Sequence, residues 1–132
     1  MAGRHPLVLI CDDEPALREL IRVTLGEAYR YDEAATVSES IEAARREPPD
    51  IVILDLMLPG GSGLDVLRVL RSDQALAHAA VVVVSAWSDE ANQSAARRDG
   101  ADAFVAKPFS PDRLQSQVEE LIGPSRSLRV EP

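Results

Sequence analysis

The feature that most constrains this chain is a series of short apolar runs that alternate with segments of helical spacing. Runs at residues 6–11, 51–54, 80–84 and 103–106 are continuously apolar, and a more polar run lies at 29–35. Continuous apolar runs of this length indicate strands that are buried on both faces of a sheet. Strands that alternate with helices favour right-handed crossovers and a parallel sheet with helices on both sides. The sequence therefore predicts a three-layer α/β fold of five parallel strands and five helices, with residues 29–35 as an edge strand.

Local signals place the helices between these runs. Pro15 stands at a first-turn position after the first run, and apolar residues then recur at helical spacing. Thr36, followed three residues later by Glu39, predicts a capping box for the second helix. Ser88 is predicted to cap the fourth helix.

Composition limits the class of protein. A chain of 132 residues fits one domain, which we predict over residues 1–122, with a polar tail or the start of a linker over 123–132. The net charge of -8 argues against nucleic-acid binding by this domain alone. The apolar runs are too short to cross a membrane and the start carries no secretory signal, so we expect a cytoplasmic protein. The single cysteine, Cys11, is expected to be a buried, unreactive thiol.

Polar side chains stand where the apolar runs stop. The first run ends at Asp12 and Asp13, the third at Asp55, the fourth at Ser85 and the last at Lys107. Because these are the carboxyl ends of parallel strands, we expect the five side chains to meet at one edge of the sheet, where α/β folds bind ligands. Carboxylates brought together repel one another unless a cation joins them, and oxygen ligands suit Mg²⁺.

This set of residue types indicates phosphoryl chemistry. A carboxylate can attack a phosphoryl group, and a metal ion and a lysine can stabilise the charge that is transferred. Asp55 stands alone after a central strand and is the best nucleophile, whereas Asp12 and Asp13 are better placed as metal ligands. Each residue also has an ordinary role as a cap, a turn residue or a solvated charge. Their joint placement, together with Lys107 as the only lysine among 14 basic residues, favours a shared site.

Four motifs follow one another along the chain, namely Asp12-Asp13, residues 55–59 with Gly63, Ser85-Ala86, and Lys107-Pro108-Phe109. By these motifs the chain resembles, over about residues 7–122, the receiver domains of two-component response regulators. The resemblance implies a flavodoxin-like fold with strand order 2-1-3-4-5, and a cis peptide bond before Pro108. It also implies two kinds of partner, namely a sensor histidine kinase or histidine phosphotransfer protein, and a downstream output domain or protein.

The resemblance also implies roles for individual residues around the acidic cluster. Asp55 would be the phosphorylated residue. Mg²⁺ would be held by Asp13, Asp55 and the backbone carbonyl of Met57, with Asp12 acting mainly through a metal-bound water. Lys107 would pair with the phosphoryl oxygens.

Four further side chains have implied roles in switching and in the lifetime of the phosphoryl group. Ser85 would hydrogen-bond the phosphoryl group, and Phe104 occupies the aromatic switch position that turns inward with it. Met57 and Trp87 occupy the two positions that flank the phosphoacceptor, where large apolar side chains would shield it from water.

Three other functions compete with this interpretation. A Mg²⁺-dependent phosphatase with an aspartyl nucleophile would need a second aspartate two residues after Asp55, where this chain has Met57. A degenerate receiver that binds partners without phosphorylation would have lost an acidic residue, the phosphoacceptor or the lysine, and all are present. Flavin binding is disfavoured because the loop after the first run is acidic. We therefore expect a phosphoaccepting signalling domain rather than an enzyme.

Overall fold

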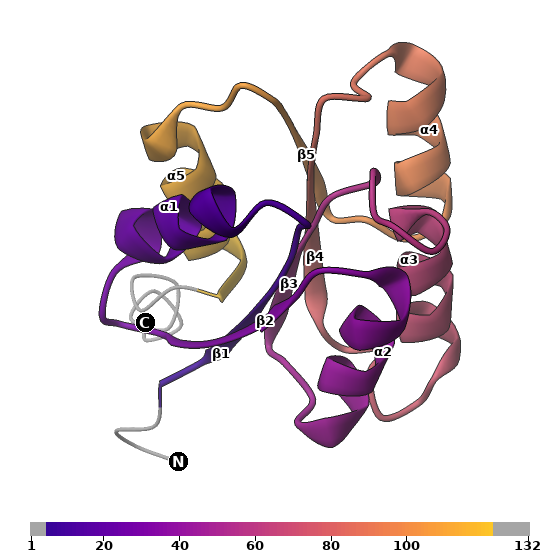
Figure 1. Cartoon of the computed structure of the whole chain (residues 1–132), viewed down its shortest axis with the longest axis horizontal. Coiled ribbons are helices and arrows are strands. Elements are labelled where there is room, and N and C mark those ends of the chain that lie inside the picture. Colours follow the sequence, from indigo (N-terminus) through magenta and orange to yellow (C-terminus); the bar gives the residue numbers. More distant parts are fainter. Residues whose placement is uncertain (1–4, 123–132) are drawn as a thin grey trace, which may run out of the picture.

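The computed structural model describes residues 5–122, in which strands and helices alternate along the chain (Figure 1). The predicted tail at 123–132 lies outside the described residues. The elements are β1 (Leu7–Cys11), α1 (Pro15–Leu25), β2 (Arg30–Ala34), α2 (Val37–Arg46), β3 (Ile51–Leu54), α3 (Gly63–Ser72), β4 (Ala80–Ser85), α4 (Glu90–Arg98), β5 (Ala103–Ala106) and α5 (Pro111–Ile122).

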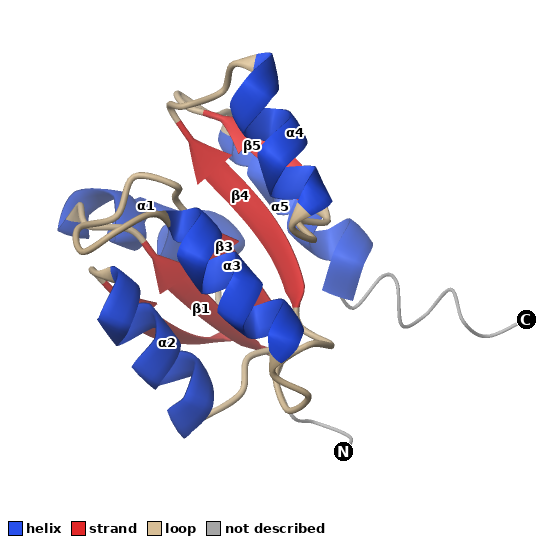
Figure 2. Cartoon of the chain, turned by 90° about the vertical axis from the view of Figure 1, so that its right-hand side faces the viewer, coloured by secondary structure: helices blue, strands red, loops and turns tan. Residues whose placement is uncertain are grey.

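The strands form one parallel sheet in the order β2-β1-β3-β4-β5, which confirms the predicted topology. Helices α1 and α5 cover one face of the sheet, and α2, α3 and α4 cover the other (Figures 1 and 2). The predicted three-layer α/β architecture is therefore confirmed. Among the described helices, none is long and apolar enough to cross a membrane.

Two hydrophobic clusters fill the space on either side of the sheet. On β3, Val52 and Leu54 pack into the cluster beneath α2, α3 and α4, whereas Ile51 and Ile53 pack into the cluster beneath α1 and α5. Because neighbouring residues of a strand point to opposite faces, a strand covered on both faces must be apolar at every position. This is the reason for the continuous apolar runs in the sequence.

Strand β2 lies at the edge of the sheet, as its polar composition predicts. Four of its five residues are only partly buried, and Ala34 alone is buried. Thr36 caps α2 as predicted, because its Oγ1 accepts a hydrogen bond from the amide of Glu39. The carboxylate of Glu39 reaches back to the amide of Ala35, one residue before the cap.

The predicted cap of the fourth helix is wrong. Helix α4 begins at Glu90, and its N-cap is Asp89, whose side chain makes no capping hydrogen bond. Ser88 lies one residue too early because its amide donates to the carbonyl of Ala86, which keeps it in a turn. The carbonyl of Ser88 instead accepts a hydrogen bond from the side chain of Gln93.

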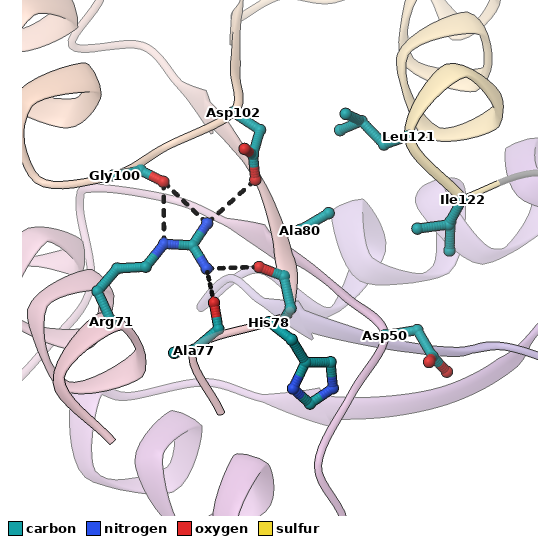
Figure 3. Close-up of a pocket in the computed structure, with 10 residues that line it drawn as sticks. Asp50, Arg71, Ala77, His78, Ala80, Gly100, Asp102, Leu121 and Ile122 are labelled. Atoms are coloured by element: carbon teal, nitrogen blue, oxygen red, sulfur yellow. Dashed lines mark hydrogen bonds and ion pairs between the residues drawn. The ribbon is translucent and has the colours of Figure 1, made fainter. Parts of the chain in front are cut away.

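Arg71, near the end of α3, ties together the loops at the amino ends of β4 and β5. Its guanidinium donates to three backbone carbonyls and to the carboxylate of Asp102, which in turn accepts from the amide of Val81. Arg71, Asp102 and the three residues that supply the carbonyls line a pocket at the amino edge of the sheet (Figure 3). The carbonyl acceptors are Gly100 at 2.8–3.0 Å, Ala77 at 2.8 Å and Ala79 at 2.6 Å.

Candidate functional site

The backbone ladder of the sheet continues for one residue beyond three strands and so carries the polar residues to the opposite, carboxyl edge. The amide of Asp12 donates to Ala34 on β2, the amide of Asp55 donates to Cys11 on β1, and the amide of Lys107 donates to Ser85 on β4. The backbone positions of Asp12, Asp55 and Lys107 are therefore set by pairing with the neighbouring strands.

Lys107 joins two of the three carboxylates. Its Nζ lies 2.9 Å from Oδ2 of Asp12 and 2.9 Å from Oδ2 of Asp55, which stand 95 and 52 residues earlier in the chain. The other oxygen of each carboxylate accepts a backbone amide from its own loop: Glu14 donates to Asp12, and Met57 donates to Asp55, both at 2.9 Å. The two aspartates are thus held in the same way on neighbouring strands.

The three acidic residues form a group that could hold a metal ion. One carboxylate oxygen from each of Asp12, Asp13 and Asp55 lies within 4.8 Å of the others. Asp12 and Asp55 are both only 3% exposed, whereas Asp13 is exposed. Because all the side-chain ligands are carboxylates, the donor set fits a hard divalent cation. The site is open to solvent on the side of Asp13.

The charges of this cluster act on one another. Burial raises the pKa of Asp12, and the negative charge of Asp55 adds to this, against the amide of Glu14 and the ammonium of Lys107. For Lys107, burial alone would lower the pKa, but hydrogen bonds and charge from Asp55 and Asp12 raise it. Because the pKa of Asp12 is higher in the folded state than in the unfolded state, its contribution to stability is lost as the pH rises through the folded-state value. A bound cation would offset this loss.

Ser85 and Phe104 lie on the same face of the sheet. The side chain of Ser85 is buried at the end of β4, and its Oγ accepts the amide of Trp87 at 3.1 Å. Phe104 on β5 pairs with Val83, two residues before Ser85, and packs partly buried against the cluster beneath α2, α3 and α4. The peptide bond between Lys107 and Pro108 is cis, as predicted.

Met57 and Trp87 rise from the loops that follow β3 and β4. Both side chains are large and about half exposed, at 41% for Met57 and 46% for Trp87. Their backbone amides bind Asp55 and Ser85 respectively, so each side chain starts two residues from a buried polar residue of the site.

Gly63 allows α3 to begin directly against the loop of Asp55. Its amide donates to Leu56, and a Cβ atom at this position would lie 2.2 Å from the carbonyl oxygen of Asp55. Ser62 and Asp65 complete a capping box, which starts the helix at this point. The glycine therefore fixes the close approach of the helix to the site.

The sequence did not single out Arg18, although this residue directly contacts the loop of Asp12, Asp13 and Glu14, here called the acidic loop. Its Nη1 donates to the backbone carbonyl of Asp12 at 2.7 Å. The chain contains 13 arginines, and nothing in the spacing of Arg18 distinguishes it from the others. Only the folded structure brings it to the site.

The fold and the site together define a class, namely a flavodoxin-like α/β domain with an acidic, cation-compatible cluster at the carboxyl edge of its sheet. Residues 8–119 match the family described as response regulator receiver domain, and the chain belongs to that family. It is accordingly a receiver domain of two-component systems, as the sequence motifs indicated.

Individual relatives agree with this assignment. The chain is 38% identical over 112 residues to the DNA-binding response regulator MtrA of Mycolicibacterium smegmatis. It is 40% identical over 112 residues to the KDP operon transcriptional regulatory protein KdpE of Escherichia coli. Each match covers 84% of this chain and 48% of the relative, so the chain spans about half the length of these curated relatives.

Solved structures support the same fold. The signal receiver domain of a putative Luxo repressor protein from Vibrio parahaemolyticus superposes with a TM-score of 0.85 at 27% identity, covering 98% of this chain and 99% of that one. A putative response regulator from Chloroflexus aurantiacus has a TM-score of 0.84 at 27% identity, with 89% of this chain and 98% of that one covered.

Proposed function

We propose that this receiver domain accepts a phosphoryl group on Asp55, with Mg²⁺ bound beside it, from a sensor histidine kinase or a histidine phosphotransfer protein. The observation that carries the proposal is the position of the Lys107 ammonium, 2.9 Å from the carboxylates of both Asp12 and Asp55. A buried carboxylate next to a fixed cation and two further acidic residues is suited to receive a strongly anionic group.

The proposed transfer uses few groups. A carboxylate oxygen of Asp55 forms a bond to phosphorus while the bond between phosphorus and the donor's imidazole nitrogen breaks, and the imidazole leaves. Asp12, Asp13, Asp55 and the backbone carbonyl of Met57 would hold Mg²⁺, which when bound neutralises charge on the phosphoryl oxygens. Lys107, already oriented toward Asp55, would pair with one of these oxygens.

The output would be a change of surface rather than catalytic turnover. Ser85 would donate its hydroxyl to the phosphoryl group, and Phe104 would move with it, altering the surface formed by α4, β5 and α5 for a downstream output domain or protein. We propose that residues 1–122 form this domain in the cytoplasm, with 123–132 as a tail or linker. DNA binding, which the name of the MtrA relative states for that protein, would require a further domain here.

Phosphorylation at Asp55 can be tested by intact mass measurement after treatment with acetyl phosphate and Mg²⁺. We expect the wild-type chain to gain one phosphoryl group and Asp55→Asn to gain none. Chelation of Mg²⁺ before the addition of acetyl phosphate should also prevent the gain. An adduct of the same size on Asp55→Asn would place the phosphoacceptor elsewhere.

A further inference from the structure

Two ion pairs link helix α1 to the edge strand β2 near the loop that follows β1. Glu33 on β2 accepts a hydrogen bond from Nε of Arg18 at 2.7 Å, and its second oxygen contacts Nη1 of Arg22. The side chain of Arg18 is only 17% exposed, whereas that of Arg22 is 37% exposed. The two arginines therefore share one carboxylate but lie at different depths.

Of these two arginines, Arg18 also contacts the site. Its Nη1 donates to the carbonyl oxygen of Asp12 at 2.7 Å, and that carbonyl belongs to the peptide unit that joins Asp12 to Asp13. The amide of Asp12 is held on its other side by Ala34 of β2 at 3.0 Å. Arg18 therefore restrains the orientation of the backbone that carries two of the three acidic residues.

The other side-chain restraints on this loop act on Asp12, whose carboxylate accepts from the amide of Glu14 and from Lys107. The N-cap residue of α1, Glu14, makes no side-chain capping hydrogen bond, so the helix start does not fix the loop in the usual way. Asp13 is exposed, and the peptide unit before it sets the position from which its side chain starts. Glu33 fixes the guanidinium of Arg18 from the sheet, where β2 pairs with β1 and Glu33 stands opposite Ile10.

We propose that Arg18 is a positioning residue of the cation site, which acts by holding the Asp12–Asp13 peptide so that the carboxylate of Asp13 faces those of Asp12 and Asp55. This inference rests on the proposed Mg²⁺ site. Groups that hydrogen-bond to the ligands of a metal orient those ligands and so set the affinity for the ion. Arg18 does this through the backbone, without touching the ion or the phosphoryl group.

The matched pair Arg18→Gln and Arg22→Gln tests this role. Arg18 and Arg22 both lie on α1, and each change removes an ion pair with Glu33 on β2. Only Arg18→Gln also removes the contact with the carbonyl of Asp12. We expect Arg18→Gln to weaken Mg²⁺ binding roughly tenfold, the lower end of the loss typical for such partners, and Arg22→Gln to leave it unchanged. The dissociation constant is obtained from the rise of the unfolding midpoint with Mg²⁺ concentration.

A purely structural role would give a different result. Arg18→Gln would then lower the midpoint without Mg²⁺ but leave the dissociation constant of Mg²⁺ at the wild-type value, and this would overturn the inference. If Arg18→Gln does not fold, Glu33→Gln takes its place, because it removes the charge that holds Arg18, and an unchanged affinity would be equally decisive. Failure of the wild-type chain to bind Mg²⁺ would instead contradict the proposed cation site itself.

Discussion

The contacts of Lys107 explain why this position has a lysine although the other 13 basic residues of the chain are arginines. Its ammonium carries three donors on a flexible stem, and it reaches carboxylates on two different strands at the same distance of 2.9 Å. Arg18 uses its rigid fork differently, with one nitrogen on Glu33 and another on a backbone carbonyl. The choice between the two basic residues therefore follows from the geometry of their acceptors.

Cys11 lies directly before the acidic cluster, but its thiol is buried. The side chain is fully buried at the end of β1, and this burial raises the pKa of the thiol to about 12. The thiolate is the reactive form of cysteine, so a thiol with this pKa is unreactive at neutral pH. The prediction of a buried cysteine is confirmed.

Met57 and Trp87 are expected to prolong the lifetime of the proposed phosphoryl group. Hydrolysis needs a water molecule aligned with the phosphorus, and Met57 and Trp87 present large apolar side chains beside Asp55 and Ser85. Neither can orient a water through an acid or an amide. We expect a Met57→Asn, Trp87→Glu double variant to lose its phosphoryl group roughly tenfold faster than wild type, because polar groups there can align the water.

The decay can be followed by intact mass after removal of acetyl phosphate. Trp87 is the only tryptophan, so its fluorescence in the wild-type chain offers an independent signal of metal or phosphoryl binding. A double variant that decays no faster than wild type would remove the shielding role of both side chains.

At the scale of elements, the two edges of the sheet have different roles. The carboxyl edge gathers charged side chains, whereas at the amino edge the guanidinium of Arg71 fastens α3 to the loops before β4 and β5. The guanidinium of Arg71 uses its donors on carbonyls and on Asp102, so none is left for a ligand in the adjacent pocket (Figure 3). We therefore assign a structural role to Arg71.

Loss of the Arg71 contacts should destabilise the fold without changing the site. Arg71→Gln removes one donor from Asp102 and the side-chain donors of three backbone carbonyls, and we expect a cost of about 2–3 kcal/mol. Arg68→Gln on the same helix removes only exposed ion pairs with Asp65 and Asp99, and should cost about 0.5 kcal/mol or less. Urea unfolding measures both values. Equal costs would contradict the structural role of Arg71, as would a change in Mg²⁺ affinity with Arg71→Gln.

At the scale of the whole molecule, a path leads from the site to the edge strand β5. Ser85 ends β4 beside the acidic cluster, and Phe104 lies on the same face of the adjacent strand β5, packed against the cluster beneath α2, α3 and α4. A charge added at Asp55 could therefore bias the position of Phe104 through Ser85, since small local charge changes can shift a two-state element.

This coupling predicts where the molecule changes on activation. We compare amide hydrogen exchange of the free chain with that of its complex with beryllofluoride and Mg²⁺, which mimics the phosphoryl group. Altered exchange is expected over residues 86–104, and Ser85→Ala should reduce it, because the hydroxyl that would bind the mimic is gone. Changes confined to α2 would argue against transmission through Ser85 and Phe104.

The sequence alone determined the layers, the order of elements and the edge at which the polar residues gather. Continuous apolar runs can be satisfied only by strands covered on both faces, and a residue that ends such a strand must lie at its carboxyl edge. Local signals were weaker where two neighbouring residues could serve equally well, as at Ser88 and Asp89. Only the tertiary structure decided that Lys107 bridges Asp12 and Asp55, that Arg18 holds the acidic loop, and that Arg71 closes the opposite edge. These contacts join residues on different elements, and their geometry depends on how helices and strands pack, which periodicity and propensity do not encode.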